Sequence, residues 1–334
     1  MRPIIAITVG DPTGIGAEIA VKTLSKPRYY ETARPVVIGD RERLRQSLKF
    51  VAEKLEINPV DNVRDARFEY GVIDVLHVDV PGVADLPYGK VLATGGEAAV
   101  RYVFKGIELA LAREVDAVCT GPLHKEAMHL AGYKQYAGHT EIFAERTGTK
   151  DYAMMLYTQG YHVIHVSTHC SLRQACDKAT KERVGKVIEL AHDMIRTYHV
   201  PNPVIAVAGL NPHSGEGGAF GTEEIESIIP AIEEAKARGI EVMGPVPPDS
   251  LFVRAGKGQY QVMVVMYHDQ GHIPVKIINF DEGVNVTLGI PIIRTSVDHG
   301  TAYGKAGKGT ASPASMEEAF KLAVTMARSK YYPE

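Results

Sequence analysis

Three histidines in this sequence stand where a buried strand is expected to end. His169, His213 and His268 each follow a short run of apolar, mostly β-branched residues within three positions. Neutral imidazoles are common ligands of Zn²⁺ and related divalent ions, and three of them leave positions open for substrate oxygens. The pattern therefore predicts a divalent-metal site that the fold must assemble from three separate segments.

Two acidic residues accompany these histidines, and each allows two interpretations. Asp269 directly follows His268, where its carboxylate could orient a ligating imidazole through the second ring nitrogen or lie exposed at a strand end. Asp249 lies in the turn-like stretch PVPPDSLF and could support the site or cap a helix. The chain has 13 histidines, so chance placement at strand ends is the alternative to the metal site.

Three glycine-rich segments could bring backbone close to a ligand. GDPTGIGAE (10–18) follows the first apolar run but does not match G-x-G-x-x-G, so it predicts only a strand–turn–helix junction. NPHSGEGGAFG (211–221) could be an anion-binding nest or a flexible turn. DHGTAYGKAGKGTASP (298–313) is a long loop rich in Gly, Ala and Lys. A loop of that length is usually functional or disordered, and its composition suits a backbone wrapped around a nucleotide.

The surrounding sequence alternates short apolar runs with longer amphipathic ones. Strands are expected at 4–9, 35–40, 116–121, 161–168, 203–210 and 260–267. Helices are expected at 96–114, 181–199, 223–239 and 315–329. This alternation predicts an α/β fold with a largely parallel sheet, in which ligands bind beyond the carboxyl ends of the strands. The three histidines and the glycine-rich segments all lie at such positions.

Composition excludes several classes of function. The 334 residues suffice for about two domains. The net charge of −3 and the absence of a basic run argue against nucleic acid as a partner. No apolar run approaches the ~20 residues of a membrane span, and Gly-Asp-Pro interrupts the first apolar stretch too early for a secretory signal. Three cysteines without a CxxC pair favour a reducing compartment, so we expect a cytoplasmic protein.

Several unusual motifs occur in the order found in one known family. They are GDPTGIGAE, TGPLHKEAM, YAGHTE, VSTHCSL, GLNPHSGEGG, YHDQGHIPVK and GVNVTLGIPIIRTSVDHGTA, spanning residues 10 to 302. With these motifs the chain resembles the 4-hydroxythreonine-4-phosphate dehydrogenase family of vitamin B6 synthesis. The segments 10–18 and 299–313 also look like the paired signatures of isocitrate and isopropylmalate dehydrogenases, which frame NAD.

This resemblance implies a fold and an assembly. The expected fold is isocitrate/isopropylmalate dehydrogenase-like, with two α/β/α subdomains and an interdomain cleft. Residues 1–130 with 285–334 would form the NAD-binding subdomain, and 131–284 the metal, substrate and dimerisation subdomain. The family forms homodimers with shared active sites, so the same is expected here.

The resemblance also implies residue roles, carried over motif by motif. The metal ligands would be His169, His213 and His268, in agreement with the strand-end pattern. Asp249, Asp269 and Lys276 would serve catalysis. The substrate would be bound by His139, Thr140, Lys276, Asn285 and Arg294. NAD would lie against Gly14, His299, Gly300, Thr301, Ala302, Gly307 and Gly309. For Lys276, the hydroxyl base and a phosphate ligand are alternative roles.

The implied activity is oxidation of the 3-hydroxyl of a 4-phosphorylated four-carbon acid, followed by loss of CO₂ from the 3-keto acid. The cofactors would be NAD and a divalent metal, with Zn²⁺ first and Mg²⁺, Mn²⁺ or Co²⁺ as alternatives. Between residues 298 and 313 the only Lys or Arg side chains are Lys305 and Lys308. Because the 2′-phosphate of NADP usually needs an Arg or Lys cluster near the ribose, this loop favours NAD over NADP.

Three features depart from the biosynthetic pattern: Leu123-His124 before Lys125, His272 where an apolar residue is common, and the C-terminal stretch AGKGTASPASMEEA (306–319). They look more like the branch that acts on 4-phospho-D-threonate or 4-phospho-D-erythronate. The alternatives are 4-hydroxythreonine-4-phosphate dehydrogenase itself, a cis-dihydrodiol carboxylate dehydrogenase, and a non-enzymatic ligand-binding protein on the same fold.

Overall fold

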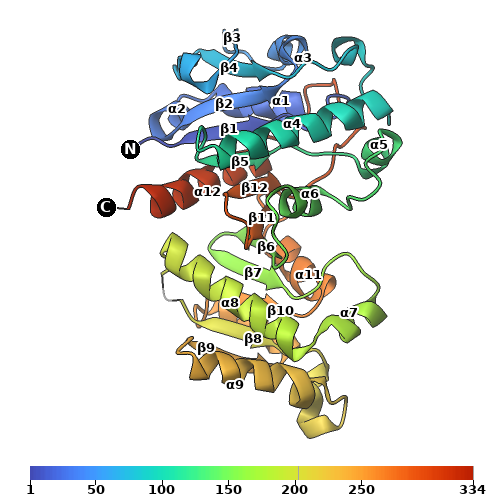
Figure 1. Cartoon of the computed structure of the whole chain (residues 1–334), viewed down its shortest axis with the longest axis vertical. Helices are drawn as coiled ribbons and strands as arrows, with labels where there is room; N and C mark the ends of the chain where they lie inside the picture. The colour runs from blue at the N-terminus through green and yellow to red at the C-terminus, as the bar shows by residue number, and fades with distance from the viewer. Residues whose placement is uncertain (202, 334) are drawn as a thin grey trace. The chain divides into compact units, whose positions relative to one another are not determined.

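The computed structural model describes residues 1–201 and 203–333, and these form two compact units. The first unit comprises residues 1–150 and 290–334, and the second comprises 151–289 (Figure 1). The first unit includes 131–150 and the second includes 285–289, so both boundaries differ from the expected 130/131 and 284/285. The physical reason at the first boundary is that α6 (His139–Arg146) packs against α4 (Ala93–Leu111) of the first unit.

The first unit is built on a parallel sheet with the strand order β3-β4-β2-β1-β5-β12. Its strands are β1 (Ile4–Thr8), β2 (Arg34–Gly39), β3 (Glu56–Val60), β4 (Val72–His77), β5 (Ala117–Thr120) and β12 (Arg294–Val297). Its other helices are α1 (Gly16–Leu24), α2 (Arg28–Thr32), α3 (Arg41–Ser47), α5 (Lys125–Leu130) and α12 (Ala314–Tyr331), with short turns η1 (Leu48–Phe50), η2 (Val63–Asp65) and η3 (Val83–Asp85).

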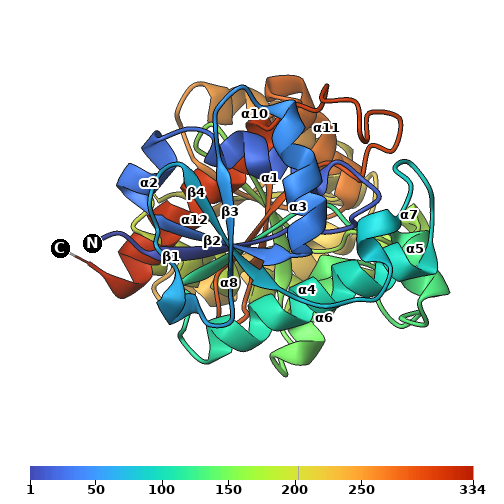
Figure 2. The same ribbon diagram turned by 90° about the horizontal axis from the view of Figure 1, so that it is seen from above.

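Helices cover both faces of this sheet. Figure 2 shows α4 on one side of the strands and α1 and α3 on the other. Gly106 lets α4 approach closely, because a Cβ there would lie 3.1 Å from Val118 and 3.4 Å from Thr8. The sheet thus has apolar strands buried on both faces, as its near-continuous runs of Ile, Val and Ala predict.

The second unit has a mixed sheet with the order β11-β6-β7-β10-β8-β9. Its strands are β6 (Ala153–Thr158), β7 (Tyr161–His165), β8 (Ile205–Ala208), β9 (Val242–Val246), β10 (Val262–Val265) and β11 (Val284–Leu288). Strand β6 runs antiparallel to β7 and β11, and the remaining pairs are parallel. The helical elements are α7 (Leu172–Lys178), α8 (Lys181–Tyr198), η4 (Pro212–Gly218), η5 (Glu224–Ile228), α9 (Ile229–Ala237), α10 (Pro248–Gly256) and α11 (His268–Ile278).

The core of this unit follows the period-two alternation of its strands. Met263 and Val265 of β10 pack with Leu251 of α10 and Val275 of α11 on one face. Helix α8 covers the opposite face, where it contacts β7, β8 and β10. Within the described residues, no helix is long and apolar enough to cross a membrane.

The six predicted strands and four predicted helices are confirmed within a few residues at their ends. The helix expected at 223–239 is interrupted, because it begins as the π-helical turn η5 before α9. Strands β3, β4, β6, β9, β11 and β12 were not predicted. Several of them contain Pro, Asp, Asn or Arg, so their apolar runs are too short to stand out in the sequence.

Candidate active site

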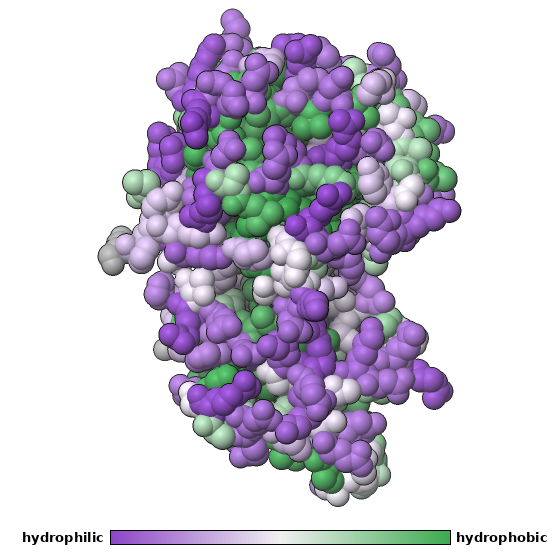
Figure 3. All heavy atoms as spheres, in the orientation of Figure 1, coloured by the Kyte–Doolittle hydropathy of each residue, from purple (hydrophilic) through white to green (hydrophobic). Residues whose placement is uncertain are grey.

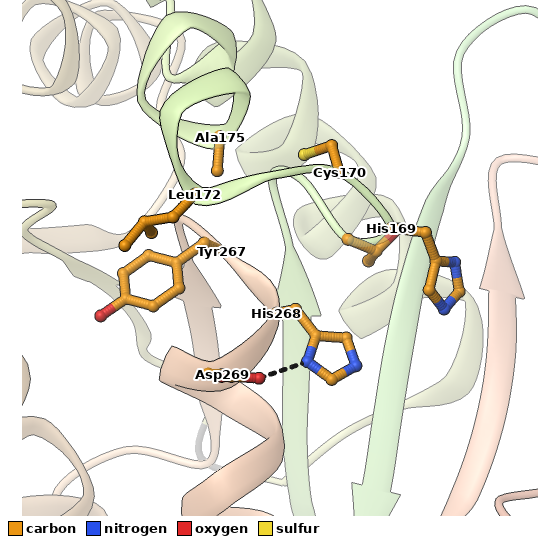
Figure 4. A pocket seen from close by; sticks show the side chains of 8 residues that line it. His169, Cys170, Leu172, Ala175, Tyr267, His268 and Asp269 are labelled. Atoms are coloured by element: carbon orange, nitrogen blue, oxygen red, sulfur yellow. Dashed lines mark hydrogen bonds and ion pairs between the residues drawn. The ribbon is translucent and has the colours of Figure 1, made fainter.

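A pocket of about 510 Å³ opens in the second unit beyond the carboxyl ends of β7 and β10. It is lined by Thr168, His169, Cys170, Leu172, Ala175, Tyr267, His268 and Asp269 (Figure 4). The two strands are parallel neighbours, with His165 of β7 opposite Val265 of β10. The segments that follow them therefore leave the sheet at the same edge, which brings two of the three predicted metal ligands together.

Asp269 fixes the orientation of His268 in this pocket. The two imidazole centroids of His169 and His268 lie 6.0 Å apart. Nδ1 of His268 lies 2.6 Å from Oδ1 of Asp269, the contact drawn as a dashed line in Figure 4. A carboxylate accepts the Nδ1–H proton in such a pair, so Nε2 keeps its lone pair for a metal ion. This donor set fits a divalent ion that has His169 and His268 as two of its ligands.

His213 lies elsewhere in the second unit. It is on η4, where residues 213–217 all have φ between 43° and 81°. The carboxylate of buried Glu224 holds this left-handed turn by accepting hydrogen bonds from the backbone N–H groups of Leu210 and Asn211 at 2.7 and 2.8 Å. Among the described residues, no three His, Cys, Asp or Glu side chains are close enough to hold an ion. One chain therefore brings together two of the predicted ligands and leaves His213 apart.

Asp249 belongs to the same region as His213. It is exposed in the first turn of α10, a helix that contacts η4. Pro247 occupies the N-cap position of α10, and no side-chain capping bond is present there. The alternative interpretation of Asp249 as a helix cap is therefore wrong.

Two further histidines continue inward from the pocket, and their arrangement was not predicted from the sequence. The His272 ring stacks on that of His268, and buried His165 lies next to His272. Burial and the proximity of His272 lower the pKa of His165 to about 3. The four-residue spacing of His268 and His272 was the signal in the sequence, because residues i and i+4 share one face of a helix.

The first unit holds three of the five predicted substrate ligands. His139 and Thr140 begin α6, and Arg294 begins β12. Arg294 is only 2% exposed, donates from its Nη2 to Oγ1 of Thr120 at 3.3 Å, and lies 5.7 Å from the Phe143 ring centroid. Burial and the charge of Arg294 lower the pKa of His139 well below its usual value, so this imidazole is neutral at neutral pH. A guanidinium beside a helix N-terminus suits an anionic group.

The remaining predicted substrate ligands are in the second unit. Lys276 is half-buried on α11, with its Nζ 5.2 Å from the centroid of the Phe280 ring. Asn285 is half-buried on β11, opposite Leu156 of β6.

The two glycine-rich segments predicted to frame NAD contact each other in the first unit. The N–H of Ile15 donates to the carbonyl oxygen of Thr301 at 3.1 Å. A Cβ at Gly14 would lie 2.9 Å from that same oxygen, so the close approach requires glycine. His299 is half-buried, whereas Gly300 and Ala302 are exposed and therefore accessible to a ligand. Gly307 and Gly309 have positive φ, and they pack on the rings of Tyr88 and Phe50, respectively.

Side chains also connect the long loop (298–313) to Asp11 in the turn after β1, to Lys22 of α1 and to His124. Tyr303 donates from its hydroxyl to Oδ2 of buried Asp11 at 2.9 Å, and its ring stacks on that of His124 at 4.9 Å. Lys22 donates to the carbonyl oxygens of Gly309 and Ala311 at 2.8 and 2.7 Å. The loop is therefore anchored at several points within this unit. His124, a departure noted in the sequence, also caps α5 through Nδ1.

Comparison with known proteins identifies the family. A family model described as the pyridoxal phosphate biosynthetic protein PdxA matches residues 31–323. The chain is 46% identical over 328 residues to the D-threonate 4-phosphate dehydrogenase of Pectobacterium atrosepticum, a match that covers 98% of this chain and 100% of the relative. The crystal structure of 4-hydroxythreonine-4-phosphate dehydrogenase from Klebsiella pneumoniae is similar with a TM-score of 0.89 and 44% identity, covering 98% of both chains. The chain belongs to the PdxA family of dehydrogenases.

Two more distant structures bear on the fold and on an alternative activity. Isocitrate dehydrogenase from Methylococcus capsulatus is similar with a TM-score of 0.50 and 13% identity, over 97% of this chain and 85% of that one. The isocitrate dehydrogenase-like fold is thus confirmed. A terephthalate 1,2-cis-dihydrodiol dehydrogenase from Burkholderia xenovorans has a TM-score of 0.68 and 29% identity, over 97% and 98% of the two chains.

Proposed function

We propose that this protein is an NAD-dependent dehydrogenase of 4-phospho-D-threonate, with 4-phospho-D-erythronate as a second substrate. Oxidation of the 3-hydroxyl transfers a hydride to NAD and gives a 3-keto acid, which then loses its carboxylate as CO₂. The name of the Pectobacterium relative, D-threonate 4-phosphate dehydrogenase, supports 4-phospho-D-threonate as the substrate. The observation that carries the proposal is the buried guanidinium of Arg294 beside His139 and the start of α6, a group suited to an anionic substrate.

The chain's own residues divide the work of binding and proton transfer. A divalent ion, when bound at His169 and His268, supplies a Lewis acid for substrate oxygens. Asp269 keeps the His268 proton on Nδ1 through the 2.6 Å contact. Lys276 either accepts the proton of the substrate hydroxyl or binds the phosphate. A Lys276→Met variant distinguishes these two roles. If Lys276 is the base, the variant has a lower kcat, whereas if Lys276 binds the phosphate, the variant has a higher KM.

NAD binds the first unit in this proposal, with the backbone around Gly14, Thr301 and Gly307 as its platform. The loop is anchored to the first turn before any ligand arrives, and its only cations are Lys305 and Lys308. We expect NAD to be preferred over NADP, because a 2′-phosphate usually needs an Arg or Lys cluster at the ribose. Comparing kcat/KM for the two cofactors decides this.

We further propose a homodimer in which two chains build each metal site. His169 and His268 share a pocket, whereas His213 lies apart on η4. Large hydrophobic side chains are exposed on the elements that carry these histidines: Leu172 at the pocket, Ile273, Ile277 and Phe280 on or just after α11, and Phe220 and Ile225 after His213. Figure 3 shows hydrophobic atoms at the lower end of the view, where Figure 1 draws the yellow segment that follows β8. A second copy covering these side chains would supply the third imidazole.

Steady-state kinetics on a panel of acids tests the proposed substrate. The panel holds 4-phospho-D-threonate, 4-phospho-D-erythronate, 4-phosphohydroxy-L-threonine and unphosphorylated D-threonate. We expect the first two to have the highest kcat/KM. Loss of the phosphate leaves a buried cation without its partner, about 2–5 kcal/mol, so activity on D-threonate should fall by more than about 30-fold. If 4-phosphohydroxy-L-threonine wins by about tenfold or more, the enzyme serves vitamin B6 synthesis instead.

A second candidate activity has support from one observation. The similarity to the terephthalate dihydrodiol dehydrogenase extends over nearly the whole of both chains at 29% identity. Its substrate class has no phosphate, so turnover of a cis-dihydrodiol carboxylate above that of the phospho-acids would favour it. The non-enzymatic alternative has no comparable support, because the chain belongs to a family of dehydrogenases.

A further inference from the structure

A row of three imidazoles runs inward from the pocket of the second unit, between α11 and β7. The centroids of His268 and His272 are 3.6 Å apart with planes inclined by 11°, and those of His272 and His165 are 4.8 Å apart. His272 is 8% exposed and His165 is 1% exposed, whereas the side chain of His268 is 39% exposed. The row therefore connects a ring at the pocket surface to the buried core.

His272 is fixed by a hydrogen bond as well as by stacking. Its Nδ1 lies 3.0 Å from the carbonyl oxygen of His268, so the Nδ1–H donates to that oxygen. This bond joins residues i and i+4 of α11 and holds the His272 ring flat against the face of His268. A leucine at this position would fill similar space but would offer neither a flat face nor a donor.

His165 supports the row from the sheet. Its Nδ1 lies 3.3 Å from the carbonyl oxygen of Met154 on β6. A Cβ at Gly271 would lie 2.5 Å from Nε2 of His165 and 2.9 Å from Cγ1 of Val163. Helix α11 can therefore approach β7 this closely only with glycine at position 271, and this approach places His272 against His165.

The His268 ring is thus constrained on two sides. Asp269 occupies its Nδ1, and His272 covers one of its faces. The remaining nitrogen, Nε2, is left for the pocket. We propose that His272 is a positioning residue that holds the His268 imidazole in the orientation needed for metal binding, with His165 and Gly271 as its support. This inference rests on the proposed metal role of His268.

Three variants of the full-length protein test it. His272→Leu removes the flat ring and the donor, and His272→Phe keeps the ring but loses the donor. His192→Leu is the matched control, a half-buried histidine on α8 outside the row. Each metal-depleted protein is titrated with Co²⁺, whose visible absorption reports ligand geometry. Thermal unfolding is measured in parallel without metal.

We expect His272→Leu to bind Co²⁺ at least about tenfold more weakly and with an altered spectrum, because residues that hold a ligating histidine in its orientation typically contribute 10–100-fold to metal affinity. His272→Phe should fall between this variant and the wild type, and His192→Leu should match the wild type. A wild-type Kd and spectrum in His272→Leu would overturn the proposal, even if its Tm falls, because filling space alone affects only stability.

The His268→Ala variant separates this inference from the proposed function. If His268→Ala loses Co²⁺ binding while His272→Leu keeps it, the positioning role is wrong and the metal role stands. If wild type and His268→Ala titrate alike, or neither binds Co²⁺, the metal role of His268 is wrong and the positioning role falls with it.

Discussion

The first unit joins its two predicted cofactor segments within one chain, whereas the second unit assembles only part of its predicted metal site. In the first unit, Ile15 and Thr301 are hydrogen-bonded although 286 positions separate them, and Tyr303 is bonded to Asp11. In the second unit, His169 and His268 share a pocket that does not include His213. Under the proposed function, cofactor binding would therefore need one folded chain, whereas metal binding would need a second copy.

The largest expected effect comes from removing a ligand of the shared pocket. His268→Ala should lower kcat/KM by on the order of 10³, because the substrate hydroxyl loses its Lewis acid. NAD binding, measured by fluorescence titration, should change little, since the proposed cofactor platform lies in the first unit. His192→Ala serves as the control on the same unit. Activity of His268→Ala within about tenfold of wild type would remove the pocket from the chemistry.

Subunit mixing sharpens the comparison. His213→Ala and His268→Ala homodimers should both be inactive. After subunit exchange, half of the dimers are mixed and each has one intact site, so activity should recover to about a quarter of wild type. The mixture of His169→Ala with His268→Ala is the matched control: both changes affect the same pocket, so no recovery is expected. Recovery of activity in the control mixture would contradict a site that takes His169 and His268 from one chain and His213 from the other. So would the absence of recovery in the mixture of His213→Ala with His268→Ala, if subunit exchange is proven.

The second unit should also be sensitive to acid. Burial lowers the pKa of His162 from 6.5 to about 4, so between these values the unfolded chain binds a proton that the folded protein does not. This contribution to stability is complete above pH 6.5 and is lost as the pH falls toward 4. The free energy of unfolding should therefore drop by up to about 2 kcal/mol more in wild type than in His162→Gln between pH 7 and pH 5. Urea unfolding at both pH values measures this, and an equal decrease in the free energy of unfolding in the two proteins would argue against a neutral His162 in the folded state.

The smallest effect tests the preformed loop of the first unit. Tyr303→Phe removes the hydroxyl that donates to buried Asp11 while keeping the ring that stacks on His124. The loss of one such bond, about 1 kcal/mol, should raise KM for NAD by about three- to tenfold and leave Co²⁺ binding unchanged. Tyr332→Phe, which removes a hydroxyl bond to Asp116 away from the loop, should leave KM for NAD unchanged. An unaltered KM in Tyr303→Phe would mean that the loop does not need this anchor.

The sequence by itself determined the elements and the placement of chemistry at strand ends. Apolar, β-branched runs form strands and amphipathic runs form helices through local preferences and periodicity, so β7, β8 and β10 could be located before the structure was known. The residues directly after them, including His169 and His268, then had to lie at one edge of a parallel sheet. Strands β9 and β11 were not predicted, because their short apolar runs contain Pro or Asn.

Only the tertiary structure decided which of these residues meet. The sheet order β7-β10-β8 does not follow the chain, and it makes His169 and His268 neighbours. The left-handed turn at 213–217, held by Glu224, was not readable from the glycines around it. The contact of His272 with His165 depends on how closely Gly271 lets α11 approach β7. Strand order and helix packing arise from contacts between residues far apart in the chain, and such contacts leave no periodic signal in the local sequence.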